Sequence, residues 1–247
     1  MAAVTGDRLG RRRSSLLLVF GILSSLLYVA MLTFVPLRWE GYSSAAQTVS
    51  ELSAIDAPTR LLWVPLGILW TLLYALFGWG VWKAAGWSPS LRIAGAIIIA
   101  HGVLGIFWPP MHMRGTEPTL TDTLHIVWSI VTVLLMALAI GFAAAALGKR
   151  FRLYSTATLL IFVVFGALTG LDGPRIAANL PTPWIGVWER VNIGVWLVWV
   201  VVLAITLLRR SRFRDATIAP MKATTQINGL VSPARGGARR ELTSCQE

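Results

Sequence analysis

Six apolar segments dominate this sequence, and each is long enough to cross a lipid bilayer. They cover residues 14–36, 61–82, 91–109, 122–147, 153–172 and 185–208. At the helical rise of about 1.5 Å per residue, each reaches roughly 30 Å, the thickness of the hydrocarbon core. In lipid only helices and closed barrels satisfy their backbone hydrogen bonds, and these continuous runs lack the alternating pattern of barrel strands. The sequence therefore predicts an all-α fold, a polytopic bundle of six transmembrane helices.

Composition supports a lipid environment and not a soluble, nucleic-acid-binding protein. Hydrophobic residues make up 55% of the chain and charged residues 13%, whereas charged residues reach about a quarter of a soluble domain. The net charge of +11 would suggest nucleic acid in a soluble chain. Here the basic residues lie mostly in short loops and in the C-terminal region, so we attribute them to membrane topology. The single cysteine, Cys245, excludes a framework of intramolecular disulfides.

The distribution of lysine and arginine predicts the orientation. With the N-terminus inside, seventeen of these residues lie on the cytoplasmic side and five on the other. The positive-inside rule then places both termini in the cytoplasm, and the plasma membrane is the expected location. We predict a basic cytoplasmic N-terminus (1–13), a transmembrane domain (14–208) and a basic, disordered cytoplasmic tail (209–247) that is attracted to anionic membrane lipids.

The first outer loop carries a polar stretch, residues 42–60, between two apolar segments. Ser43 or Ser44 is a suitable N-cap for a short helix over residues 45–54, and Pro58 breaks the chain before the second segment. We therefore expect a short helical lid over the outer end of the bundle. Within the bundle, small residues four apart, at Gly141–Ala145, Gly166–Gly170 and Ala96–Ala100, predict close approach of helices.

Polar residues within the apolar segments gather in the halves predicted to face outward. Asp122, His125 and Ser129 follow one helical face, and Glu189 and Asn192 open the sixth segment. Ionisable groups at such depth are costly and usually face one another or a wet cavity. We expect one outward-facing pocket lined by Ser50, Glu51, His101, Asp122, His125, Ser129, Asp172, Glu189, Arg190 and Asn192.

An architectural interpretation of the same residues is open as well. Glu189 would pair with an arginine of the lid, and Arg190 with Asp172 or Glu51. Such buried pairs fix the arrangement of helices more than they add stability. His125 would then only hydrogen-bond to a carbonyl group or to Asp122.

A zinc site built from His101, His112, His125 and Asp122 is a further alternative. These ligand types suit a hydrolytic metal centre with an open position. However, the spacing contains no His-x-x-x-His pair, and no cysteine lies in the apolar region. Zinc therefore stays a minor alternative for the cofactor.

Several short motifs resemble one membrane family. They are Tyr42, Ser50-Glu51-Leu52-Ser53-Ala54, His125 and Gly186-Val187-Trp188-Glu189-Arg190 followed by Trp196. Over residues 17–210 the chain resembles the bacterial integral-membrane family catalogued as domain of unknown function 998. The resemblance implies a six-helix membrane protein and gives Ser50, Glu51, His125, Glu189 and Arg190 as matching positions, but it implies no activity.

The chain departs from that family in the third segment. An acidic residue tends to follow the proline there, whereas this chain reads Phe107-Trp108-Pro109-Pro110-Met111, which weakens the metal hypothesis. The alkaline ceramidase-like zinc amidases are a more distant comparison for an enzyme. Their late pair of histidines four apart has no counterpart in this sequence.

Three function hypotheses follow. The first is an accessory protein whose outward pocket binds a lipid or another amphipathic small molecule. The second is an intramembrane enzyme acting on an outer-leaflet substrate, by metal-assisted hydrolysis or by acid–base chemistry such as isoprenoid cyclisation, with Glu51, His125 and Glu189 as catalytic candidates. A transporter is weaker, because the inner halves carry few polar groups and no repeated halves are visible. The sequence leaves the ligand and the oligomeric state open.

Overall fold

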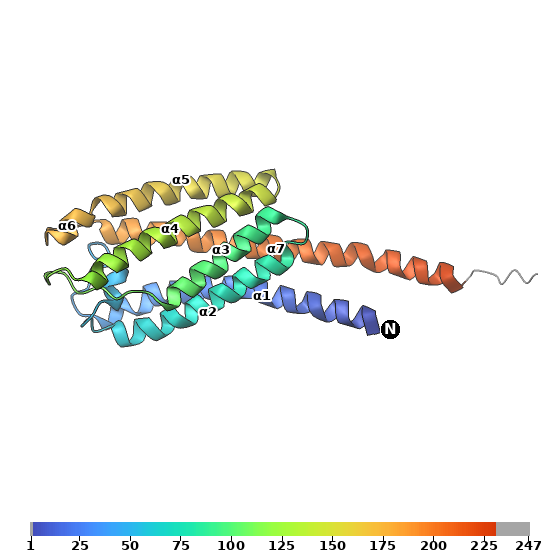
Figure 1. The fold of residues 1–247 in the computed structure, drawn as a ribbon, viewed down its shortest axis with the longest axis horizontal. Coiled ribbons are helices and arrows are strands. Elements are labelled where there is room, and N and C mark those ends of the chain that lie inside the picture. Colours follow the sequence, from blue (N-terminus) through green and yellow to red (C-terminus); the bar gives the residue numbers. More distant parts are fainter. Residues whose placement is uncertain (1, 231–247) are drawn as a thin grey trace, which may run out of the picture. The chain divides into compact units, whose positions relative to one another are not determined.

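The computed structural model describes the backbone of residues 2–230 and the side chains of residues 15–211. Two compact units are present, Met1–Arg209 and Arg210–Glu247, and the first contains the helical bundle (Figure 1). The elements are α1 (Ala2–Phe34), η1 (Pro36–Arg38), η2 (Ser50–Ser53), α2 (Arg60–Ala84), α3 (Pro89–Ile106), α4 (Leu120–Ala146), α5 (Lys149–Leu171), α6 (Gly173–Ala177) and α7 (Ile185–Leu230).

Six of the described helices are long and apolar enough to cross a membrane. The spans are Ser15–Arg38, Arg60–Ala84, Pro89–Ile106, Leu120–Ala146, Lys149–Ala177 and Ile185–Ser211. This confirms the predicted all-helical fold with six spanning helices, and the protein is a multi-pass membrane protein. The orientation of the termini stays a prediction. Part of the predicted disordered tail, residues 231–247, lies outside the described residues, while α7 continues to Leu230.

The two ends of the bundle differ in their connections. One end carries the long connections 35–59, 107–119 and 172–184, and we call it the loop end. The other carries the short connections 85–88 and 147–148, and we call it the turn end. In Figure 1 the loop end of the bundle lies on the left.

Glycines allow α2 and α3 to pack closely. A Cβ on Gly78 would lie 2.8 Å from the backbone nitrogen of Ile99, and a Cβ on Gly95 would lie 2.7 Å from that of Trp82. Backbone atoms cannot move aside as the tip of a side chain can, so these contacts require glycine. The predicted close approach is wrong at Gly141 and at Gly170, because a Cβ at either position would meet no atom within 4 Å.

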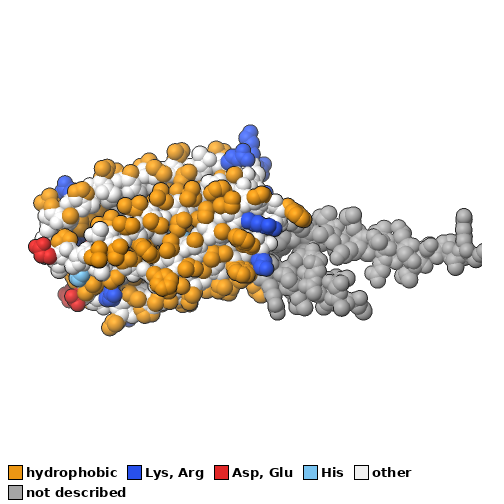
Figure 2. Space-filling model, in the orientation of Figure 1, with side chains coloured by type: hydrophobic (Ala, Val, Ile, Leu, Met, Phe, Trp, Pro, Cys, Tyr) orange, Lys and Arg blue, Asp and Glu red, His pale blue; other side chains and the backbone are white. Residues whose placement is uncertain are grey.

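Several large aromatic residues lie inside the bundle, while many aliphatic residues are exposed on its outer faces. Trp196, Trp199 and Phe77 are fully buried, while Leu61 and Leu153 on the outer faces are 90% and 73% exposed. On the face drawn in Figure 2, hydrophobic side chains cover most of the described part of the bundle. A soluble protein rarely exposes so large an apolar surface, and lipid chains are the solvent that suits it.

Candidate functional site

The segment 42–59 lies at the loop end and contains less helix than the sequence predicts. Its regular part is the single 3-10 turn Ser50–Ser53, not a helix over residues 45–54. Side chains compete for the backbone here. Gln47 accepts a hydrogen bond from the backbone N–H of Ser43, and Glu51 accepts one from that of Thr48. Bonds of this kind offer the backbone an alternative to the helical pattern.

Glu51 forms a buried ion pair with Arg114 of the 107–119 connection. The Nε of Arg114 lies 2.8 Å from Oε1 of Glu51, and its second terminal nitrogen lies 3.0 Å from Oε2. Thr48 adds hydrogen bonds to Oε2 from its backbone N–H at 2.6 Å and its hydroxyl at 3.0 Å. The side chain of Glu51 is only 3% exposed, so the carboxylate depends on these donors in place of water.

Arg114 also joins the three long connections of the loop end. It donates to the hydroxyl of Thr182 at 2.7 Å and to the carbonyl oxygen of Ala46 at 3.1 Å. The Thr182 hydroxyl donates to the same carbonyl. One guanidinium group therefore holds the 35–59, 107–119 and 172–184 connections together.

Glu189 and Arg190, in the first turns of α7, bind the same segment through its backbone. Glu189 accepts from the backbone N–H of Val49 at 2.5 Å and from that of Ser50. Arg190 donates to the carbonyl oxygens of Ser44 at 2.7 Å and Gln47 at 3.2 Å. The two charged side chains near the start of α7 thus bind the backbone N–H and carbonyl groups of residues 44–50.

Tyr42 and Gly186 complete this contact. Arg190 donates to the Tyr42 hydroxyl at 2.8 Å, and that hydroxyl donates to the carbonyl of Thr48 at 2.8 Å. Burial raises the pKa of Tyr42 to about 12, against the opposing effect of the Arg190 hydrogen bond. A Cβ on Gly186 would overlap the carbonyl oxygens of Ser44 and Gln47, so glycine permits the close approach of α7.

We call this group of side chains the loop-end cluster. Its members are Tyr42, Thr48, Glu51, Arg114, Thr182, Glu189 and Arg190, with Ser50 contributing through its backbone. The pairs differ from those that the sequence predicts. Glu189 binds backbone N–H groups and no lid arginine, Arg190 binds carbonyl groups, and Glu51 takes Arg114.

A second polar group surrounds the start of α4. Asp122 accepts from the backbone N–H of His112 at 2.7 Å and from Thr119, whose capping box begins the helix. Nδ1 of His125 lies 2.8 Å from the carbonyl oxygen of Pro109 and 3.1 Å from Nε1 of Trp108. A protonated nitrogen donates to the carbonyl and an unprotonated one accepts from the indole, so His125 makes one of these bonds at a time. Ser129 donates to the carbonyl of His125.

The remaining predicted residues lie outside both groups. His101 is buried among Trp70, Tyr74 and Trp196. Asn192 is buried with its Oδ1 lacking a hydrogen-bond partner within the described protein. Asp172 lies 3.8 Å from Arg175. The ten predicted pocket residues therefore lie in several different environments.

The metal hypothesis finds no cluster to support it. The three histidines lie in different surroundings: His101 among aromatic rings, His112 against Asp122, and His125 against Trp108 and Pro109. Within the described part of the chain, no three His, Cys, Asp or Glu side chains converge so as to hold a metal ion.

One backbone contact joins the loop-end cluster and the polar group at the start of α4, since the backbone of Ile55 pairs with Met111 and His112.

Sequence reasoning missed Arg114 and Thr182. Arg114 carried a usable signal, because it is the single lysine or arginine in the connection 107–119. A buried Glu51 at the same end requires a cation, and the long connections of the loop end offer few. Thr182 carried no comparable signal, since an isolated threonine in a loop is unremarkable.

Six spanning helices define a multi-pass membrane protein. At its loop end, charged side chains bind the backbone of the 35–59 connection, and one of them, Glu51, pairs with Arg114. The family described as "Protein of unknown function (DUF998)" matches residues 22–206, and the chain belongs to that family. The family resemblance drawn from Ser50-Glu51, His125 and Glu189-Arg190 is confirmed. No curated protein and no solved structure matches the chain.

Proposed function

We propose that the protein binds an amphipathic membrane molecule, whose head group is received at the loop-end cluster when segment 42–59 lifts away as a lid. One observation carries the proposal: the charged side chains of α7 and of the 107–119 connection take most of their partners from this single segment. Arg190 binds Ser44, Gln47 and Tyr42, and Glu189 binds Val49. Arg114 binds Glu51 and Ala46.

The groups uncovered by lid opening suggest the chemistry of the ligand. Arg114 and Arg190 are suited to a phosphate, which guanidinium groups bind through paired hydrogen bonds. Glu189 is suited to an ammonium group. A phospholipid head group that carries a phosphate and an amine therefore complements all three. The predicted orientation places this site at the outer leaflet, and the enzymatic and transport alternatives have no specific observation in their favour.

Glycine substitutions in α7 offer a test that opens the lid without removing a charged residue. The new Cβ at Gly186 would also lie 2.9 Å from Nη1 of Arg190. Gly186→Ala places a methyl group against the carbonyl oxygens of Ser44 and Gln47, whereas Gly194→Ala on the same helix meets nothing within 4 Å. If the closed lid excludes the ligand, apparent affinity is reduced by the small open fraction, and opening the lid restores it. We expect Gly186→Ala to retain more phosphatidylethanolamine than Gly194→Ala, by about tenfold for 1.4 kcal/mol of opening.

Two measurements on purified protein separate lid opening from binding. Hydrogen exchange of residues 44–50 reports opening, and quantitative mass spectrometry reports bound phosphatidylethanolamine. Adding Arg190→Gln to Gly186→Ala should remove the gain, because the phosphate loses a guanidinium. Faster exchange with an unchanged lipid content would contradict the proposal. Glu51→Gln loosens the same segment by removing the charge that Arg114 binds. An unchanged lipid content in both Gly186→Ala and Glu51→Gln would also contradict the proposal.

A further inference from the structure

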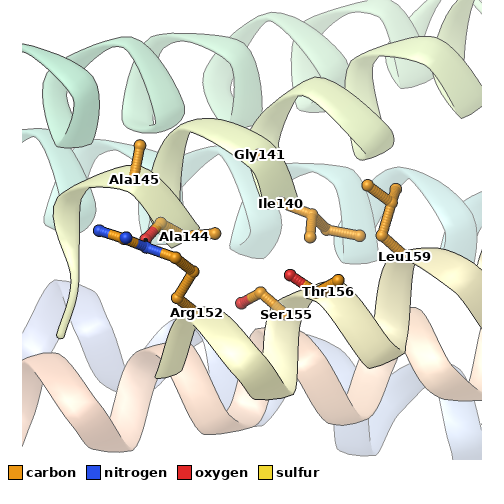
Figure 3. Close-up of a pocket in the computed structure, with 8 residues that line it drawn as sticks. All are labelled: Ile140, Gly141, Ala144, Ala145, Arg152, Ser155, Thr156 and Leu159. Atoms are coloured by element: carbon orange, nitrogen blue, oxygen red, sulfur yellow. Dashed lines mark hydrogen bonds between the residues drawn. The ribbon is translucent and has the colours of Figure 1, made fainter. Parts of the chain in front are cut away.

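A groove lies between α4 and α5 near the turn end, away from the loop-end cluster. It has a volume of about 490 Å³ and is lined by Ile140, Gly141, Ala144, Ala145, Arg152, Ser155, Thr156 and Leu159 (Figure 3). That volume lies within the range of about 300–1,000 Å³ usual for small-molecule sites. The groove is thus too large to be a packing defect.

Small residues on α4 form one wall of the groove and leave the space beside them unfilled. A Cβ on Gly141 would meet nothing within 4 Å, in contrast to Gly95, whose Cβ would press on the backbone of α2. In membrane helices such small residues usually mark a surface that another apolar body approaches closely. Here α5 does not fill the space, so the wall is available to a different occupant.

The opening of the groove carries positive charge. Arg152 extends from α5 toward α4, where its Nε lies 3.4 Å from the carbonyl oxygen of Ala144 (Figure 3). This is a long hydrogen bond, and a phosphate is a stronger acceptor for a guanidinium. Lys149 and Arg150, also exposed, begin the same helix.

The lining changes from polar to apolar with depth. Arg152 lies one turn into α5, Thr156 follows it one turn later, and Leu159 lies roughly 10 Å from Arg152 along the helix. Ser155 is fully buried and accepts a hydrogen bond from the indole of Trp199. A cationic mouth, a hydroxyl group and an aliphatic interior in this order match a phosphate joined to an acyl chain.

We propose that the α4–α5 groove is a binding site for an anionic phospholipid of the leaflet at the turn end. Its phosphate is bound by Arg152 with support from Lys149, and one acyl chain lies against Gly141 and Leu159. This site is separate from the loop-end cluster and does not depend on the function proposed for it.

A second copy of the chain is the rival occupant, and charge argues against it. In a two-fold dimer the same patch packs against itself. The basic residues Lys149, Arg150 and Arg152 would then face their own counterparts, and like charges repel across an apolar interface. An anionic head group brings the opposite charge to the same place.

Native mass spectrometry of the purified full chain tests the site, with phosphatidylglycerol and phosphatidylcholine as probes. Arg152→Gln should lower the affinity for phosphatidylglycerol about tenfold, the effect of losing one charge-assisted contact. Arg92→Gln is the matched control, since Arg92 is exposed at the same end and lies outside the groove. Gly141→Leu should displace the lipid by filling the groove, whereas Gly67→Leu, also in open space, should not.

Three outcomes of these measurements would overturn the proposal. Equal losses in Arg152→Gln and Arg92→Gln would mean unspecific attraction of anionic lipid to a basic surface. Equal affinity for glycerol 3-phosphate and phosphatidylglycerol would mean that the groove binds a free phosphate and no chain. A dimer in the parent chain that Gly141→Leu splits, with lipid content unchanged, would show that a second copy occupies the face.

Discussion

The loop-end cluster and the aromatic group around His101 both place polar atoms inside an apolar bundle, yet they satisfy them differently. At the loop end, Glu51, Arg114, Glu189 and Arg190 are bound by hydrogen bonds of 2.5–3.2 Å. In the aromatic group, Nδ1 of His101, the Tyr74 hydroxyl and the indole nitrogens of Trp70 and Trp196 have no partner within the described protein.

The backbone explains this difference. At the loop end the chain is irregular, so the N–H groups of Thr48 and Val49 and the carbonyls of Ser44 and Gln47 are free to bind side chains. The aromatic group lies on regular helices, whose backbone groups already bind one another. Its rings therefore interact by faces and edges, as Tyr74 does with Trp70 at 5.3 Å and with His101 at 5.1 Å between centroids. In this membrane bundle, it is the irregular backbone, more than charge alone, that supplies hydrogen-bond partners to buried polar side chains.

The largest expected effect is the loss of the Glu51 charge. Glu51→Gln leaves Arg114 with no carboxylate in a largely buried position, and breaking a buried pair from one side costs about 3–5 kcal/mol. We expect about 3 kcal/mol, because Arg114 is 19% exposed and water compensates in part. Denaturant unfolding of the purified protein in detergent measures this loss.

Glu40→Gln is the matched control for that substitution. Glu40 is an exposed residue shortly before the same segment, and surface substitutions usually change stability by less than about 0.5 kcal/mol. If Glu51→Gln and Glu40→Gln destabilise the protein equally, the hydrogen bonds of the loop-end cluster do not stabilise it. The contrast with the aromatic group would then be lost.

The same contrast separates what the sequence predicts from what it does not. The six spans are predictable because each is continuous and apolar, which depends only on neighbours in the chain. Glu51, Glu189 and Arg190 are recognisable because charges are rare in such a chain. Their partners are not recognisable, since Arg114 lies 63 residues from Glu51 and Val49 lies 140 residues from Glu189.

Two local predictions from the sequence are wrong, and both have physical reasons of the same kind. The helix predicted over residues 45–54 is replaced by turns, because Glu51 and Glu189 bind the backbone N–H groups of Thr48 and Val49, which a helix would use. The close packing predicted at Gly141 is absent, because small-residue spacing permits an approach but does not choose the partner. The pairs in α4 and α5 are open at Gly141 and Gly170, whereas the close contact at Gly95 of α3 lies outside the predicted pairs.

A smaller effect comes from removing one hydroxyl in each region. Tyr42→Phe deletes an oxygen that accepts from Arg190 and donates to Thr48, so it should cost about 1 kcal/mol. Tyr74→Phe deletes a buried oxygen without a partner in the described protein, so stability should stay unchanged or rise by up to about 1 kcal/mol. Parallel denaturation curves give both values. A loss for Tyr74→Phe as large as that for Tyr42→Phe would erase the distinction between the two regions.

The last effect is the pH dependence that Tyr42 contributes at the loop end. Burial raises the pKa of Tyr42 from its ordinary value of 10.0 to about 12. Between these values the unfolded chain releases the phenolic proton and the folded chain keeps it, so the contribution of Tyr42 is complete below pH 10 and lost as pH rises towards 12. The stability advantage of the parent chain over Tyr42→Phe should therefore stay constant from about pH 8 to about pH 10 and narrow between about pH 10 and about pH 12. Comparing the two denaturation midpoints at each pH cancels the titration of the other tyrosines. A constant difference between about pH 10 and about pH 12 would mean that the Tyr42 hydroxyl is open to water, and that the contact with Arg190 and Thr48 does not close the loop end as described.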